Sequence, residues 1–167
     1  MNGFHEITPA EMGSDVFTRI GKQWMLIGAG REGDHNMMTA SWGGLGVLWN
    51  TPVSTVYIRP SRYTMEFTER EDYYALCFFG EEYRDALTFC GRHSGRDGDK
   101  CEQTGLTPCF DRQAPYFKEA ELVLICRKLY AQDMDPALFL DESIENHYHG
   151  SDYHRVYIGE IVTVLKK

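Results

Sequence analysis

Segments rich in Val, Ile, Tyr and other strand-forming residues recur through the whole chain, and turn residues separate them. Strands are expected at residues 24–30 (WMLIGAG), 36–42 (NMMTASW), 53–60 (VSTVYIRP), 73–80 (YYALCFFG), 120–132 and 153–167. Helical patterns are fewer, at 62–72, 81–93 (stopped by Gly91) and 97–105 (closing at Gly105), with at most a turn at 135–143. Strict alternation of strand and helix is absent, which disfavours a doubly wound parallel sheet. We therefore expect a mainly β (α+β) chain: a closed or half-closed antiparallel barrel with peripheral helices.

Length and charge narrow the class of protein further. A chain of 167 residues, 43% hydrophobic and 25% charged, predicts one globular domain over residues 1–167. The net charge of −8 argues against nucleic acid as a partner, because a polyanion needs clustered positive charge.

Targeting signals and cysteines indicate the compartment. The start of the chain lacks a basic region followed by an apolar run, so no signal peptide is expected, and no apolar stretch is long enough to cross a membrane. The five Cys are odd in number and form no C-x-x-C pair. Reduced thiols and a cytoplasmic location are the prediction.

The segment IRPSRYT (58–64) has the residue types of an anion site. Arg59 and Arg62, with the hydroxyls of Ser61 and Thr64, fall at or just before an expected helix start. Free backbone N–H groups and the positive dipole end of a helix bind anions there, and Arg can grip phosphate oxygens bidentately. The alternative is that Ser61 or Thr64 only caps the helix while the Arg side chains are solvated.

A second cationic loop, CGRHSGRDGDK (90–100), carries Arg92, His93, Ser94, Arg96 and Lys100. By itself it is compatible with an ordinary basic surface loop. In a protein of net charge −8, two separate loops that concentrate cations and hydroxyls favour one shared anion.

Residues 36–52 (NMMTASWGGLGVLWNTP) contain no charged side chain. One interpretation is a strand running into a loop that faces a flat apolar ligand, and the other is a buried hairpin. Beside the two phosphate-binding candidates, an apolar strand with exposed backbone, Thr39, Ser41 and Trp42 suits flavin mononucleotide (FMN), whose ring needs an uncharged wall.

Three histidines, His147, His149 and His154, lie close together near the C-terminus. An H-x-H spacing can supply metal ligands from one strand face, but no carboxylate or Cys completes the set at a recognisable spacing. No metal site is predicted, and solvated or hydrogen-bonding histidines are favoured.

The ordered set NMMTASWGG, RPSRYT, EEYRDAL, CGRHSGRDGDK, GLTP and YHRVYIGEIV resembles the flavin reductase-like, FMN-binding split-barrel family, and within it the flavoredoxin-like branch. The resemblance covers about residues 14–165. It implies an antiparallel split β-barrel of Greek-key type that binds FMN without a covalent link and forms a homodimer. The expected dimer contact is apolar surface near Trp42, Trp49 and the 73–80 strand.

The resemblance also implies roles for individual residues. Contacts to the flavin ring and ribityl chain fall on Asn36, Thr39, Ala40, Ser41 and Trp42; contacts to the phosphate fall on Arg59, Ser61, Arg62 and Thr64; and contacts to the phosphate and ring rim fall on Ser94, Arg96 and Lys100. His154 is the candidate catalytic residue, although the flavin itself carries most of the chemistry.

Two departures from the family pattern are visible. Many relatives have Gly-Asp-His before the last strand, whereas here one extra residue separates Asp152 from His154. The segment GVLWNTP replaces a small-residue or Ser-rich bridge, and Trp49 either caps the ring or packs at the dimer contact.

The implied activity is that of an NAD(P)H:flavin oxidoreductase, which passes electrons from a reduced nicotinamide through FMN to a flavin, an iron centre or a protein acceptor. No Rossmann fingerprint is present, so the nicotinamide would stack directly on the flavin. The alternatives are a flavoredoxin-like carrier that a protein partner reduces, and a non-catalytic FMN-binding or storage protein.

Overall fold

The computed structural model describes residues 3–13 and 15–167 of the chain. Its strands are β1 (His5–Ile7), β2 (Met25–Arg31), β3 (Asp34–Ala40), β4 (Gly43–Leu48), β5 (Thr51–Ile58), β6 (Tyr73–Phe78), β7 (Pro108–Cys109), β8 (Tyr116–Phe117), β9 (Leu122–Asp133) and β10 (Arg155–Lys166). Its helical segments are η1 (Pro9–Met12), α1 (Val16–Thr18), η2 (Arg19–Gln23), α2 (Thr64–Arg70), η3 (Glu81–Tyr83), α3 (Arg84–Arg92), α4 (Lys100–Thr104), η4 (Pro136–Leu138) and η5 (Glu142–His147).

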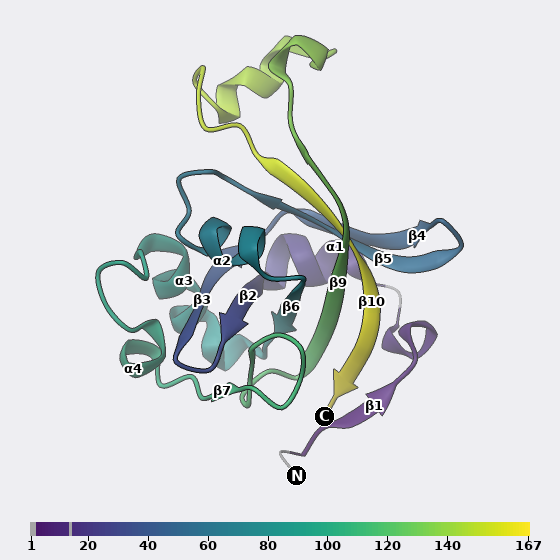
Figure 1. The fold of residues 1–167 in the computed structure, drawn as a ribbon, viewed down its shortest axis with the longest axis vertical. Helices are drawn as coiled ribbons and strands as arrows, with labels where there is room; N and C mark the ends of the chain where they lie inside the picture. The colour runs from purple at the N-terminus through teal and green to yellow at the C-terminus, as the bar shows by residue number, and fades with distance from the viewer. Residues whose placement is uncertain (1–2, 14) are drawn as a thin grey trace.

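One curved antiparallel sheet forms the body of the molecule, with strand order β3-β2-β6-β9-β10-β5-β4 and β1 added beside β10 (Figure 1). β9 and β10 are the longest strands and pair over most of their length, with register shifts at Ile158/Gly159 and Ile161/Thr163. Such irregularities bend a strand and increase its twist. A Cβ at Gly159 would lie 2.5 Å from the Tyr74 hydroxyl oxygen, so only glycine fits at this bend. The predicted antiparallel split barrel with peripheral helices is confirmed.

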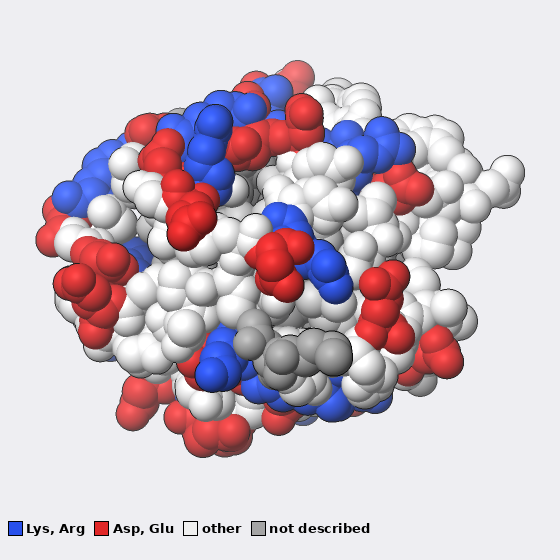
Figure 2. Space-filling model, turned by 60° about the horizontal axis from the view of Figure 1, so that its bottom comes forward, with Lys and Arg blue, Asp and Glu red and all other residues white. Residues whose placement is uncertain are grey.

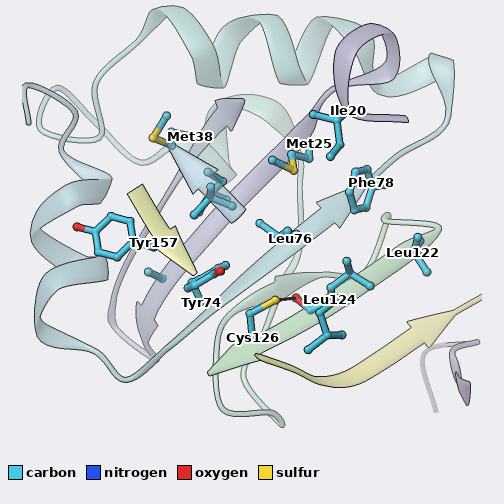
Figure 3. Close-up of a cluster of buried hydrophobic side chains, with 14 of the residues drawn as sticks. Ile20, Met25, Met38, Tyr74, Leu76, Phe78, Leu122, Leu124, Cys126 and Tyr157 are labelled. Atoms are coloured by element: carbon cyan, nitrogen blue, oxygen red, sulfur yellow. Dashed lines mark hydrogen bonds between the residues drawn. The ribbon is translucent and has the colours of Figure 1, made fainter. Parts of the chain in front are cut away.

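Two hydrophobic clusters hold the fold. The first fills the barrel interior, where Met25, Leu76, Phe78, Leu122 and Leu124 come from adjacent strands and point toward one another (Figure 3). The second lies between the sheet and the α3–α4 side, around Leu87, Phe117 and Val123. Every strand that separates these clusters is buried on both faces, which explains the nearly continuous apolar runs of β2, β6 and the first half of β9.

The expected strands and helices are present, with small shifts of their ends. The apolar runs at 24–30 and 36–42 pair as the β2–β3 hairpin, and Gly105 ends α4 in the left-handed conformation. Gly91 is not the stop of α3, which continues to Arg92. A Cβ at Gly91 would come 3.3 Å from the Thr39 Cβ, so this glycine lets α3 approach β3.

The uncharged segment after β3 folds as the β4–β5 hairpin, a strand pair that the glycine-rich sequence concealed. Its tip, Trp49-Asn50, has positive φ at both residues, as a two-residue turn of this type requires. The hairpin is not buried within the chain, because Val47 is 77% and Trp49 59% exposed. We expected a buried strand at 73–80, and β6 is indeed buried at the centre of the sheet; the apolar surface that we also expected near it does not lie on this strand.

The connection between β9 and β10 rises away from the barrel and carries η4 and η5 (Figure 1). On the face drawn in Figure 2, Lys and Arg are interspersed with Asp and Glu, and no continuous basic patch forms there. Within the described part of the chain, no helix combines the length and apolar character needed to span a membrane.

Candidate functional site

A row of cavities, linked by shared lining residues, runs along the barrel edge where β3 and β5 end. A cup of about 130 Å³ lies between the start of α2 and the loop after α3. Arg62 connects it to a cavity of about 200 Å³ beside residues 38–42. Trp42, Tyr57 and His154 connect that cavity to a third of about 580 Å³. The two cationic loops and the uncharged strand end therefore line a row of adjoining cavities.

Two cations line the cup: Lys100, which is buried, and Arg62, which is half-buried. Lys100 is only 4% exposed, and its ammonium donates to the carbonyls of Met37 (2.8 Å) and Cys90 (2.9 Å). Arg62 donates to the Gly91 carbonyl at 2.9 Å. Both cations thus satisfy carbonyls in the last turn of α3, where a helix leaves its acceptors unpaired. Lys100 has three donor hydrogens and Arg62 five, so both keep donors for a ligand.

These two cations lack a carboxylate partner. Among the residues that the structure describes, no Asp or Glu lies within ion-pair distance of Lys100 or Arg62. Burial lowers the pKa of Lys100 to about 8, and burial together with the charge of Arg59 lowers the pKa of Arg62. The neighbouring Cys90 is no substitute anion, since burial raises its pKa to about 11. A bound phosphate would neutralise the two positive charges, which no carboxylate of the described residues compensates.

The remaining cup residues shape its walls. The Asn36 amide donates to the Thr64 hydroxyl at 3.0 Å inside the protein, and Ser94 lines the opposite side. A Cβ at Gly95 would be 2.2 Å from the Asn36 amide oxygen, so glycine is required for the loop to close over this strand. Thr64 does not cap α2, and Ser61 does not either, because no side-chain hydrogen bond caps that helix. The capping alternative therefore fails.

Arg59 and Ser61 are engaged differently from Arg62. The Ser61 backbone N–H and hydroxyl both donate to the Asp152 carboxylate, at 2.9 and 2.6 Å. Arg59 lies 4.0 Å from the same carboxylate and donates to the His147 carbonyl at 2.7 Å. Ser61 still lines the cup, whereas Arg59 lines the next cavity. The residues of the RPSRYT segment thus have two kinds of partner: Arg62 lines the cup, whereas Arg59 and Ser61 contact the carboxylate of Asp152.

Arg96 lies outside the cup. Its guanidinium forms an ion pair with Glu66 and lies over the Tyr63 ring, 4.5 Å from the centroid. Its backbone N–H donates to the Ser94 hydroxyl at 3.2 Å, which orders the loop that carries Ser94. Arg96 is therefore positioned to support the cup wall rather than to line it.

The end of β3 forms the wall of the middle cavity. Thr39, Ala40, Ser41 and Trp42 all line it, and the Thr39 hydroxyl is already donated to the Leu87 carbonyl. No charged side chain belongs to this run, so the wall suits an uncharged ring system.

His154 closes this space together with an unpredicted partner, Tyr148. The Tyr148 hydroxyl lies 2.7 Å from His154 Nδ1, and both residues are buried. Burial, with the nearby charge of Arg59, lowers the pKa of His154 to about 4, so the imidazole is neutral at physiological pH. Trp42 packs against the ring at 5.4 Å between centroids. Tyr148 lies in the irregular 147–155 segment, whose sequence has no period that would reveal its partner.

The other histidines do not extend this site into a metal centre. The ring of His147 packs against Trp42 at 5.3 Å, and His149 has a left-handed backbone, φ 52°. Over residues 3–13 and 15–167, no three His, Cys, Asp or Glu side chains gather as metal ligands.

Comparison with known protein families finds a match that covers almost the whole chain. Residues 17–166 match the family described as the flavin reductase like domain. No curated protein matches the sequence.

Several solved structures have a similar fold. They include a flavoredoxin from Methanosarcina acetivorans (23% identity, TM-score 0.69, covering 87% of this chain and 68% of that one). An FMN-binding protein from Thermus thermophilus with bound 1-cyclohex-2-enone is also similar (20% identity, TM-score 0.67, covering 84% of this chain and 68% of that one). A third is nitrilotriacetate monooxygenase component B from Bacillus cereus (17% identity, TM-score 0.66, covering 95% of this chain and 79% of that one).

Proposed function

The chain belongs to the flavin reductase-like domain family, and on this premise we propose that it is an FMN-dependent oxidoreductase, working as one domain, that takes electrons from NADH or NADPH. It passes them to a flavin, an iron centre or a protein. Membership agrees with the predicted family, fold and FMN cofactor.

One observation carries the proposal: the buried Lys100 and the half-buried Arg62, neither paired with a carboxylate of the described residues, stand at one end of a cavity row, and the strand end 39–42 that walls the next cavity has no charged side chain. A ligand that fits must be anionic at one end and flat and apolar at the other. FMN has this distribution, because its phosphate and its ring lie at opposite ends of the ribityl chain.

The chain's own residues divide the work of holding such a ligand. Lys100, Arg62 and Ser94 would bind the phosphate, with Ser61 at the rim of the cup. Ala40, Ser41 and Trp42 would flank the ring, and neutral His154 would offer a hydrogen bond without adding charge. FMN, when bound, supplies the hydride and electron chemistry, which no protein side chain performs.

A flavoredoxin-like electron carrier is the second candidate, and one observation favours it. The chain shares its fold with a flavoredoxin and has no glycine-rich dinucleotide fingerprint for a nicotinamide cofactor. In that case a protein donor would reduce the bound flavin. A storage protein would hold flavin that neither donor reduces.

Stopped-flow absorbance of the FMN-loaded protein separates these functions. We expect NADH or NADPH to bleach the flavin band rapidly under anaerobic conditions. Bleaching by a reduced protein donor but by neither nucleotide would replace the reductase with the carrier. A purified protein that binds no flavin after reconstitution would overturn both.

A further inference from the structure

The pair Tyr148–His154 has a geometry that determines which imidazole nitrogen carries the hydrogen. The Tyr148 hydroxyl has one hydrogen and two neighbours: His154 Nδ1 at 2.7 Å and the Met134 sulfur at 3.4 Å. A ring nitrogen is a much stronger acceptor than a thioether, so the hydroxyl donates to Nδ1. The hydrogen of a neutral imidazole then sits on Nε2.

Nε2 has no hydrogen-bond partner among the described residues and is not an enclosed atom, so it is open to the cavities that His154 lines. His154 lines both the 200 Å³ and the 580 Å³ spaces, and among the described residues only Tyr148 hydrogen-bonds to its ring. The rings of Trp42 and Tyr57 pack against His154, the His147 ring packs against Trp42, and Arg59 and Asp152 are the charged groups nearby. Burial, the largest effect, and Arg59 both disfavour a second proton on the imidazole, and together they outweigh Asp152, which favours one.

The end of β5 holds Tyr148 rigidly. The Arg59 guanidinium lies 5.0 Å from the Tyr148 ring centroid and donates to the adjacent His147 carbonyl. Ser61 grips Asp152, two residues before His154. Phe139 and Tyr153 pack on the Tyr148 ring at 5.8 and 5.0 Å. The hydroxyl is therefore fixed relative to the imidazole before any ligand binds.

We propose that Tyr148 is a positioning residue that holds His154 in its Nε2–H tautomer, so that His154 donates a hydrogen bond to a carbonyl oxygen of an uncharged ring in the 580 Å³ cavity. The carbonyl edge of a flavin and the carboxamide of a nicotinamide both present such an oxygen. This role rests on the proposed function for its ligand, whereas the tautomer itself is a property of the protein alone.

The test is a long-range ¹H–¹⁵N correlation spectrum of protein labelled at histidine, recorded near pH 7 with and without FMN. His154→Gln identifies the His154 resonances. In the wild-type protein we expect Nδ1 to be unprotonated and Nε2 to carry the hydrogen. In Tyr148→Phe, which keeps the ring packing, we expect the Nδ1–H tautomer to gain population, so that the Nδ1 shift moves toward that of a protonated nitrogen.

Tyr153→Phe is the matched control, because its hydroxyl donates to Glu145 and not to the imidazole. It should leave the His154 signals unchanged. A wild-type protein with Nδ1 protonated, or a Tyr148→Phe spectrum identical to wild type, would overturn the proposal. The wild-type spectrum decides the tautomer even if the variant fails to fold.

Kinetics separate this proposal from the function on which it rests. Tyr148→Phe should slow flavin bleaching by saturating nicotinamide about fivefold if the bonded oxygen is on the nicotinamide, or weaken FMN binding about fivefold if it is on the flavin, because one net hydrogen bond contributes about 1 kcal/mol. Wild-type protein that binds FMN, shows the Nε2–H tautomer and is bleached by neither nucleotide would overturn the reductase function and leave the positioning role intact.

Discussion

At the scale of single residues, Lys100 is the most informative side chain in the molecule. A lysine that is 4% exposed, bonded only to carbonyls and depressed in pKa is costly unless a ligand compensates it. Its neighbour Arg62 is half-buried, also donates to carbonyls and also has a lowered pKa. Such unsatisfied cations are the physical reason to place the phosphate here rather than at the better-paired Arg59 and Ser61.

Replacing Lys100 by Met should weaken FMN binding at least about tenfold, because one charge-assisted hydrogen bond contributes roughly 1.5–3 kcal/mol. Riboflavin, which lacks the phosphate, should bind nearly as before. Titration of both flavins into the flavin-free protein measures the ratio. Lys128→Met is the matched control: Lys128 also donates to two carbonyls, of Thr68 and Glu69, but it does not line the cup. An unchanged FMN-to-riboflavin ratio in the Lys100 variant would remove Lys100 from the site.

The pKa of Lys100 also predicts how FMN binding depends on pH. Without ligand this ammonium loses its proton near pH 8, well below its ordinary value of 10.5. A phosphate dianion attracts the charged form, so binding raises the pKa and takes up a proton above pH 8. FMN affinity should therefore fall as pH rises from about 8 toward 10, and riboflavin affinity should not. Isothermal titration across this range tests it, and a Lys100→Met protein with the same pH slope would contradict it.

At the scale of elements, the β9–β10 excursion is attached to the barrel largely by its return segment. Asp152, with a left-handed backbone at φ 57°, accepts two hydrogen bonds from Ser61. This contact joins residues 91 positions apart and sets where the chain re-enters β10. The excursion carries Tyr148, so the stability of this one contact bears on the geometry around His154.

Asp152→Asn should loosen the excursion and lower the free energy of unfolding by about 1–3 kcal/mol, because a charged acceptor becomes neutral while Asn still tolerates the left-handed backbone. Hydrogen exchange should increase in residues 134–153 more than in the barrel. Asp141→Asn is the control, since Asp141 accepts only from the nearby Ser143 N–H within the excursion. Equal protection of the excursion in Asp152→Asn and wild type would show that Ser61 does not hold it.

At the scale of the whole molecule, the protruding β4–β5 hairpin is the feature that suggests assembly. Val47, Leu48 and Trp49 expose apolar side chains at its tip, and Trp42 at its base is 45% exposed. Large exposed apolar side chains grouped on one element are typical of a surface that another protein covers. A two-fold contact between copies of the chain remains our prediction, with packing rather than ring capping as the favoured role of Trp49.

Light scattering at micromolar concentration should give the mass of a dimer. Trp49→Lys combined with Val47→Lys should shift it toward the monomer, because two charges would be buried at the contact. Val162→Lys, which adds a charge at an exposed position of β10, should leave the dimer intact. A wild-type protein that scatters as a monomer with FMN bound would refute the dimer.

Local sequence patterns were sufficient to predict most of the long strands. Apolar runs with turn residues between them predicted the β2–β3 hairpin, β5, β6, β9 and β10, because strand pairing needs continuous apolar faces that the sequence displays directly. The order of the short motifs was sufficient to identify the family, and Gly105 was sufficient to predict where α4 ends. β4 escaped notice because its glycines carry no periodic signal, and its pairing with β5 supplies the order.

Which partner each polar side chain contacts was decided only by the tertiary structure. Lys100 meets the Met37 carbonyl across 63 residues, and Ser61 meets Asp152 across 91. No local period records such distances, so Arg59, Ser61 and Arg62 looked equivalent in the sequence although one segment serves two partners. The Tyr148–His154 pair lies only six residues apart, yet it forms because β5 and the barrel edge hold an irregular turn in place. Elements follow from local side-chain patterns, whereas a site follows from which carbonyls and carboxylates the folded chain brings to each charge.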